Sequence, residues 1–245
     1  MLILLPPSEK KATATEGPAL DLAALGHPEL TATRERVLAA LQETSRRPDA
    51  RDVLALPAGQ AEEALRRNLA LREAPTLPAA ELYTGVLYDN LDLPSLDPAA
   101  AGERILVFSG LWGALRLTDR IPPYRLSMAA SLPRHGRLST LWRPALTEAL
   151  RPDGLIVDMR SGPYAAAWKA PGAVAVRVFR ERVVAGVAKR TVVSHMAKAT
   201  RGEIAHALIA SGARPRTPEQ LLKTVAGLGY AAELNGPNLD IVLPG

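Results

Sequence analysis

The chain has 245 residues, of which 47% are hydrophobic and 22% are charged, as in globular proteins that bury a sizeable core. Aromatic residues make up only 4%, which leaves little material for base stacking, and the absence of cysteine excludes disulfides, thiol catalysis and cysteine-bound metals. The net charge of +5 hides an asymmetry: residues 1–103 hold 10 Lys and Arg against 16 Asp and Glu, whereas residues 104–223 hold 20 against 7. The basic part indicates an anionic partner such as nucleic acid or a phosphorylated metabolite, unless its arginines are merely scattered over the surface.

No apolar run approaches the roughly 20 residues that a membrane helix requires. The first residues, MLILLPP, lack the basic start and the length of a signal peptide. We therefore expect a bacterial, cytoplasmic protein with no membrane partner.

The first predicted strand is Leu2–Leu5, a short apolar run that ends at Pro6-Pro7, because proline donates no hydrogen bond to a sheet. Ser8, Glu9, Lys10 and Lys11 then lie on a loop at the carboxyl end of the strand, where α/β sheets commonly bind ligands. A solvated polar loop is an equally good interpretation of these four residues alone.

An amphipathic helix is predicted over 31–47, with Thr33 as its N-cap, and a second one over 59–72. Both helices are expected to be structural and not to carry functional residues. The segment 81–90 contains Tyr83-Thr84-Gly85, where glycine permits a turn or a close backbone approach.

The stretch over 105–128 is the first place to look for function. Ile105–Phe108 is typical of a buried strand, and Ser109-Gly110 ends it. Large polar and amphipathic side chains then surround Pro122-Pro123, which is a costly composition for a mere connector; they are Trp112, Arg116, Asp119, Arg120, Tyr124 and Arg125.

The second half alternates between predicted strands and helices. We expect a helix over 138–150, a strand over 154–159 that ends at Arg160-Ser161-Gly162-Pro163-Tyr164, and a hairpin of strands 173–179 and 183–187 joined by Arg180-Glu181-Arg182. A helix over 195–210, weakened at Gly202, presents Lys198 and Arg201 on one face.

The end of the chain, LLKTVAGLGYAAEL over 221–234, imitates a DNA-binding helix-hairpin-helix. Asn235-Gly236 between two short apolar runs instead favours a terminal β-hairpin over 230–243.

The chain carries no recognised motif for a metal site or for a serine-hydrolase nucleophile. His195 and His206 would stand about 16 Å apart on one helix, too far to share a metal, and HExxH and Gly-x-Ser-x-Gly patterns are missing. We therefore expect neither a metal nor another cofactor. Glu9, Asp119 and Asp158 are candidate general bases, although orienting nearby arginines is the more common role of such carboxylates.

The string SGLWGALRLTDRIPPYRLSM over 109–128 closely resembles the signature of the YaaA peroxide-stress protein family. The resemblance runs from LILLPPSEKK through ELYTG, TLW and SHMAKATRG to TPEQLL and GLGY, in matching order. It implies a single domain over 1–245, with a mixed α/β fold around a positively charged cleft, in a cytoplasmic protein that binds DNA and limits peroxide and iron-promoted damage. In some relatives the first loop is one residue shorter, so either Lys10 or Lys11 is the equivalent lysine, and Ala199 stands where some relatives carry a second lysine.

The resemblance also implies a set of DNA- or anion-binding residues, namely Ser8, Lys10, Lys11, Ser109, Arg116, Tyr124, Arg125, Ser161, Tyr164, Lys198 and Arg201. We expect the loops after Leu5, Phe108 and Met159 to converge, because each follows a strand and carries a serine. The first interpretation is sequence-independent binding of double-stranded DNA through its phosphates. The second is an enzyme that binds a small phosphorylated or carboxylated ligand in the same place. The third is a basic globular protein that binds DNA only incidentally.

Overall fold

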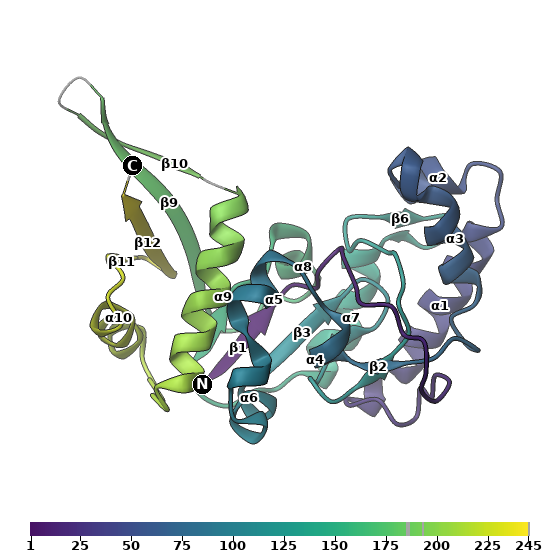
Figure 1. Cartoon of the computed structure of the whole chain (residues 1–245), viewed down its shortest axis with the longest axis horizontal. Helices are drawn as coiled ribbons and strands as arrows, with labels where there is room; N and C mark the ends of the chain where they lie inside the picture. Colours follow the sequence, from purple (N-terminus) through teal and green to yellow (C-terminus); the bar gives the residue numbers. More distant parts are fainter. Residues whose placement is uncertain (185–186, 193, 245) are drawn as a thin grey trace.

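A computed structural model describes residues 1–184, 187–192 and 194–244. Its centre is a mixed eight-stranded sheet in the order β11-β12-β9-β8-β1-β3-β4, with β10 paired to β9 (Figure 1). Its strands are β1 (Leu2–Leu5), β3 (Ile105–Ser109), β4 (Gly113–Leu115), β8 (Ile156–Asp158), β9 (Val174–Val184), β10 (Val187–Val192), β11 (Ala232–Asn235) and β12 (Asn238–Pro244). The expected α/β fold with a mixed sheet is confirmed.

Helices cover both faces of this sheet. In Figure 1, α5, α6 and α9 lie in front of it and α7 and α8 lie behind it. The α-helices are α1 (Thr31–Ser45), α2 (Ala50–Val53), α3 (Ala61–Leu69), α4 (Ala79–Leu82), α5 (Val86–Leu91), α6 (Pro98–Arg104), α7 (Leu138–Ala149), α8 (Gly162–Ala167), α9 (Ser194–Ala210) and α10 (Pro218–Gly227). Two small antiparallel pairs lie apart from the main sheet: β2 (Leu77–Pro78) with β5 (Arg120–Ile121), and β6 (Ser131–Leu132) with β7 (Gly136–Arg137).

The first strand lies between two parallel neighbours in the sheet. β1 pairs in parallel with β3 on one side, Ile3 opposite Ile105, and with β8 on the other, Ile3 opposite Val157. Strands that are buried on both faces consist of continuous apolar residues, as LILL and ILVF do here. Because β1, β3 and β8 run in the same direction, their carboxyl ends meet at one edge of the sheet.

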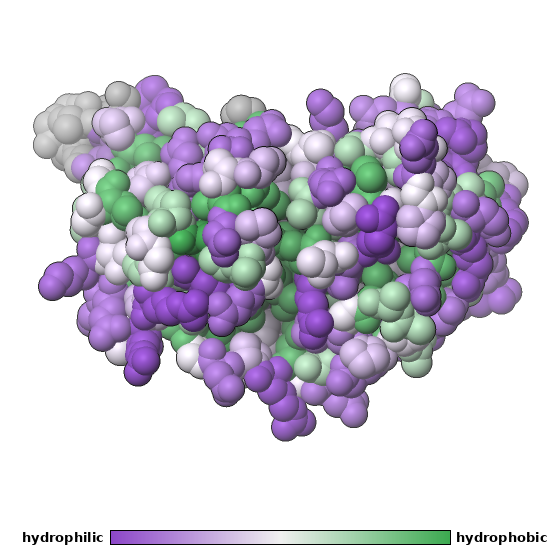
Figure 2. Space-filling view, turned by 60° about the horizontal axis from the view of Figure 1, so that its bottom comes forward, coloured by the Kyte–Doolittle hydropathy of each residue, from purple (hydrophilic) through white to green (hydrophobic). Residues whose placement is uncertain are grey.

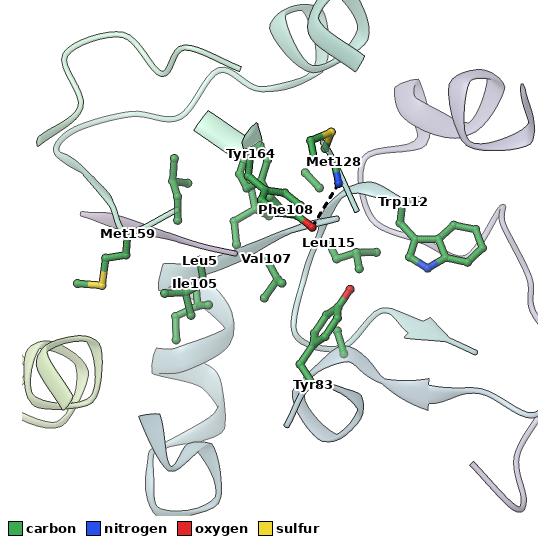
Figure 3. Close-up of a cluster of buried hydrophobic side chains, with 14 of the residues drawn as sticks. Leu5, Tyr83, Ile105, Val107, Phe108, Trp112, Leu115, Met128, Met159 and Tyr164 are labelled. Atoms are coloured by element: carbon green, nitrogen blue, oxygen red, sulfur yellow. Dashed lines mark hydrogen bonds between the residues drawn. The ribbon is translucent and has the colours of Figure 1, made fainter. Parts of the chain in front are cut away.

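The apolar core around these strands is one continuous cluster of buried side chains. Figure 3 shows part of it, with Leu5, Ile105 and Val107 at the centre and the aromatic residues Phe108, Tyr164, Trp112 and Tyr83 around them. On the face drawn in Figure 2, hydrophilic residues cover the outer parts and hydrophobic residues reach the surface nearer the middle. No helix within the described ranges is long and apolar enough to cross a membrane.

Most predicted elements are present, with shorter bounds in several cases. The cap expected at Thr33 is wrong, because α1 already begins at Thr31, directly after the short 3-10 helix Pro28–Leu30, and Thr33 is buried. Gly85 lies at the start of α5 with φ 99°, which a side chain would strain, so glycine serves the expected turn.

The predicted hairpin of strands 173–179 and 183–187 is wrong in its turn. β9 continues through the charged residues Arg180-Glu181-Arg182, and β10 pairs with it from Val187 onward, so the connection falls at 185–186, outside the described residues. The charged run fits a strand because Glu181 lies directly opposite Arg190 on β10, and the two side chains form an ion pair of 2.8 Å.

The end of the chain is a β-hairpin, as predicted. β11 and β12 pair antiparallel across Asn235 and Asn238, and β12 also pairs in parallel with β9. α10 is therefore followed by a strand at Ala232 rather than by the second helix that a helix-hairpin-helix requires.

Gly202 lies where two helices touch, instead of weakening α9. A Cβ atom added to it would lie 2.2 Å from the backbone oxygen of Leu87 on α5 and 3.0 Å from the backbone nitrogen of Leu91. A side chain here would push the two helices apart, because backbone cannot move aside as a flexible side chain can.

We predict that Gly202→Ala destabilises the protein by about 1–3 kcal/mol despite alanine's better helix propensity. Gly227→Ala at the end of α10 is the matched control, because no atom lies within 4 Å of its added Cβ. Urea unfolding of both variants measures the difference. Equal effects of the two substitutions would contradict the close approach of α5 and α9.

Candidate functional site

A cavity of about 390 Å³ opens at the carboxyl ends of β1 and β8. Its wall is built from the loop after β1, the start of α5, the segment after Tyr124, the start of α8 and the first half of α9. Among its lining residues are Ser8, Glu9, Lys10, Lys11, Thr84, Arg125, Ser127, Ser161, Tyr164, Lys198 and Arg201. Among the described residues, five basic side chains line the cavity against one carboxylate, so its interior favours an anion.

The structure brings eight of the eleven expected site residues to this one cavity: Ser8, Lys10, Lys11, Arg125, Ser161, Tyr164, Lys198 and Arg201. They come from four separate stretches of sequence. Two of the three loops expected to converge, after Leu5 and after Met159, meet here.

Ser109 does not reach the cavity. Its strand turns back at once into β4, and its Oγ accepts hydrogen bonds from the backbone N–H groups of Leu111 (3.2 Å) and Trp112 (3.0 Å). The side chain is fully buried. The third loop therefore closes a tight turn beneath the cavity instead of lining it.

Tyr124 is buried and does not line the cavity, whereas its neighbour Arg125 does. The ring is 3% exposed, and its hydroxyl lies 2.6 Å from Ser109 Oγ and 2.9 Å from the hydroxyl of Tyr83. Burial raises the pKa values of both tyrosines, so the floor beneath the cavity consists of neutral, mutually hydrogen-bonded hydroxyls.

Arg116 lies elsewhere. It lines a second cavity, of about 320 Å³, together with His27, Glu103 and Arg151. Its backbone N–H donates to Asp119 Oδ2 (2.9 Å), and Asp119 Oδ1 accepts from the backbone of Gly26 (2.8 Å). Asp119 thus organises a backbone turn and does not hold Arg125.

Arg125 is positioned by a residue for which the sequence carries no signal. Asn68, buried on α3, accepts from the backbone N–H of Arg125 (2.9 Å) and donates to its carbonyl oxygen (3.0 Å). The Arg125 side chain is 23% exposed, and its guanidinium donates to Glu9 (2.9 Å), whose side chain is 80% exposed. The backbone is therefore held firmly, while the ion pair is of the surface kind that an incoming anion can replace.

Lys11 is partly buried in the cavity wall. Its backbone bridges to Tyr83, and its Nζ donates to the carbonyl oxygen of Ser8 (2.9 Å) and lies 4.2 Å from the centre of the Tyr124 ring. Burial lowers the pKa of Lys11 from its usual 10.5 to about 7, and repulsion from Arg125 acts in the same direction. Nearby Glu9 partly opposes both effects.

Arg201 and Tyr164 connect the cavity wall to the scaffold. Arg201 donates to the carbonyl oxygen of Val176 on β9 (3.0 Å), and burial lowers its pKa. The hydroxyl of Tyr164 accepts from the backbone N–H of Met128 (3.4 Å), the contact drawn as a dashed line in Figure 3. Lys10 and Lys198 are exposed at the rim.

Within the described ranges, no three His, Asp or Glu side chains are grouped closely enough to hold one metal ion. The cations that line the cavity can bind a phosphate or carboxylate group, with Arg125 offering two donors in a planar fork.

The lowered pKa of Lys11 predicts a pH-dependent stability. Between about pH 7 and 10.5 the unfolded lysine binds more protons than the folded one, so the free energy of unfolding rises with pH through this range, by at most about 1.4 kcal/mol per pH unit. Below pH 7 both states are protonated and the cost of burying the charge is fully present. Urea unfolding of wild type and Lys11→Met at several pH values isolates this contribution, and a pH-independent difference between them would contradict it.

Comparison with known proteins places the chain in a family. A family model described as "Peroxide stress protein YaaA" matches residues 1–235. A UPF0246 protein of Streptomyces coelicolor is 48% identical over 245 residues, covering 97% of this chain and 94% of the relative. A UPF0246 protein of Corynebacterium efficiens is 42% identical, covering 96% of each chain, and one of Corynebacterium glutamicum is 40% identical, covering 97% and 96%. With this match over nearly its whole length, the chain belongs to the peroxide stress protein YaaA family.

Proposed function

We propose that this protein acts in the peroxide-stress response by binding double-stranded DNA through its phosphates at the basic cavity. The observation that carries the proposal is the gathering of Lys10, Lys11, Arg125, Lys198 and Arg201 at one cavity, where Glu9 is the one carboxylate among the described lining residues. Contacts of this kind to the nucleic-acid backbone are largely independent of base sequence.

The arrangement of the five cations suits a polymer that passes over the opening. Lys10 and Lys198 are exposed at the rim and accessible to the phosphates of a passing strand, whereas Lys11, Arg125 and Arg201 are partly buried and suit a phosphate group that enters the cavity. A partly enclosed arginine is effective here because its planar fork holds a phosphate at two points.

The β9–β10 hairpin supplies further support. Arg182 and Lys189 are exposed and lie directly opposite each other on the two strands. Like charges in this position destabilise a strand pair unless an anion compensates them. The hairpin projects from the sheet on the side where α9 begins, and α9 carries Lys198 (Figure 1).

A small phosphorylated or carboxylated ligand is the second candidate. The cavity of about 390 Å³ falls in the size range of small-molecule sites, and Lys11 lies at its floor rather than on an open surface. Calorimetric titration with a nucleoside monophosphate and with a 20-base-pair duplex separates the two candidates. Binding of the monophosphate alone would replace the DNA proposal with this one.

We expect duplex binding to weaken steeply with salt. If the protein engages about four phosphates, the slope of log K against log salt is about −3.6, and Lys10→Ala and Lys198→Ala each reduce its magnitude by about 0.9. Lys223→Ala, an exposed lysine on α10 away from the cavity, is the control and leaves the slope unchanged. Fluorescence titrations of duplexes at 50–300 mM salt measure these values, and a flat salt response would remove DNA from the proposal.

For Arg125→Lys, we expect weaker binding without loss of fold. The substitution keeps the positive charge but loses the two-point geometry, so binding should weaken roughly tenfold. The free energy of unfolding should change by less than about 1 kcal/mol, because only the exposed pair with Glu9 is altered while the backbone contacts to Asn68 remain. Unchanged affinity combined with a clear loss of stability would show that Arg125 is a scaffold residue.

A further inference from the structure

Lys11 occupies an unusual position for a lysine. Its Nζ lies over the ring faces of Tyr124 (4.2 Å) and Tyr83 (5.5 Å) and donates to one backbone carbonyl, that of Ser8. Among the described side chains, no carboxylate lies within 4.0 Å of this nitrogen. An ammonium has three N–H donors, so a lysine held in this way has hydrogen-bonding capacity left for a ligand in the cavity.

The groups facing Lys11 favour a free amine at neutral pH. Enclosure by the cavity floor and repulsion from Arg125 and Arg67 lower its pKa to about 7, although Glu9 and the tyrosine rings favour the charged form. The tyrosines do not compensate the charge, because burial raises their pKa values and keeps their hydroxyls protonated. Near pH 7, Lys11 is therefore an uncharged amine in a large fraction of the molecules, as nucleophilic lysines are.

The surroundings of this amine are built for an anion. Arg125 and Lys198 line the same cavity as Lys11 and come from two other parts of the chain. A ligand whose anionic group is bound by these two side chains would extend its remaining atoms toward the cavity floor. The ligand atom that an uncharged amine attacks most readily is a carbonyl carbon.

We propose that Lys11 forms an imine with an aldehyde or ketone that carries a phosphate group, with Arg125 and Lys198 holding the phosphate. This chemistry is shared by free sugar phosphates and by the open-chain sugar of a DNA nucleotide that has lost its base. The inference rests on the proposed anion-binding role of the cavity and adds a covalent reaction to it.

The reaction balances without an oxidant or a reductant. The Nζ lone pair forms a bond to the carbonyl carbon while the C=O π pair moves onto oxygen, which takes a proton from solvent. Nitrogen then loses a proton, the hydroxyl group takes one and leaves as water, and a protonated C=N bond remains. The step depends on the uncharged amine, so its rate rises with pH up to the pKa of Lys11 and then levels off.

The test is reductive trapping on the full chain. Ribose 5-phosphate is incubated with the protein and sodium cyanoborohydride, which reduces an imine to a stable secondary amine, and peptide mapping by mass spectrometry locates the added mass. We expect Lys11 to be labelled at least tenfold faster than its exposed neighbour Lys10 at pH 7, with a rate that levels off above about pH 7. Ribose without phosphate should label Lys11 much more slowly.

Two variants control the result. Lys11→Arg keeps a positive charge and removes the amine, so labelling at this position should vanish while the thermal melt still shows a folded protein. Arg125→Lys leaves Lys11 in place and should slow labelling by the phosphorylated probe but not by ribose. Labelling spread evenly over Lys10, Lys11 and Lys198, or no labelling of Lys11, would overturn the proposal.

A second probe distinguishes the two sources of the ligand and separates this inference from DNA binding. A duplex with one abasic aldehyde site is trapped in the same way: labelling of Lys11 by the duplex assigns the reaction to DNA, and labelling by ribose 5-phosphate alone assigns it to a small metabolite. If duplexes fail to bind but ribose 5-phosphate labels Lys11, the DNA proposal fails and the imine stands. If duplexes bind with the expected salt slope and neither probe labels Lys11, the imine fails and DNA binding stands.

Discussion

The parallel pairing of β1 with both β3 and β8 is the constraint on which the rest of the structure depends. Because β1 is buried on both faces and bonded on both edges, its carboxyl end has one possible position, between the ends of its two neighbours. Pro6 and Pro7 follow immediately and cannot continue the sheet. The loop carrying Ser8 and Lys11 must therefore leave the sheet at this point, and the cavity forms where it does so.

The same arrangement determines which residues lie on the floor and which lie on the wall. The tight turn from β3 into β4 pulls Ser109 beneath the cavity, where it binds Tyr124. The longer connection after β8 leaves Ser161 and Tyr164 on the wall. Because the two connections differ in length, the hydroxyls of Ser109 and Tyr124 lie below Lys11, while Ser161 and Tyr164 line the cavity beside its other cations.

Much of the positive charge between residues 104 and 223 belongs to the scaffold. Arg160, 5% exposed, forms an ion pair with Asp158 (2.7 Å) and donates to backbone carbonyls, and Arg104 donates to the carbonyl oxygens of Leu208 and Ala213. Arg177 is paired with buried Asp240. Arginine suits such positions because its five donors satisfy several carbonyls at once. The net charge of this region is therefore larger than the charge that is free to bind a ligand, part of which lines the cavity.

The sequence by itself determined the buried strands, most helices and the terminal hairpin, because these depend on local patterns: apolar runs, helical spacing and an Asn-Gly turn. It also indicated the loops of the site, since prolines and small polar residues directly follow apolar strands. Only the tertiary structure decided that Ser109 and Tyr124 lie under the cavity and that Arg116 lines a different one, because the direction of a side chain depends on how its segment turns and packs. The role of Asn68 and the low pKa of Lys11 likewise had no local signal. Both result from groups far apart in the sequence that meet only when the sheet has formed.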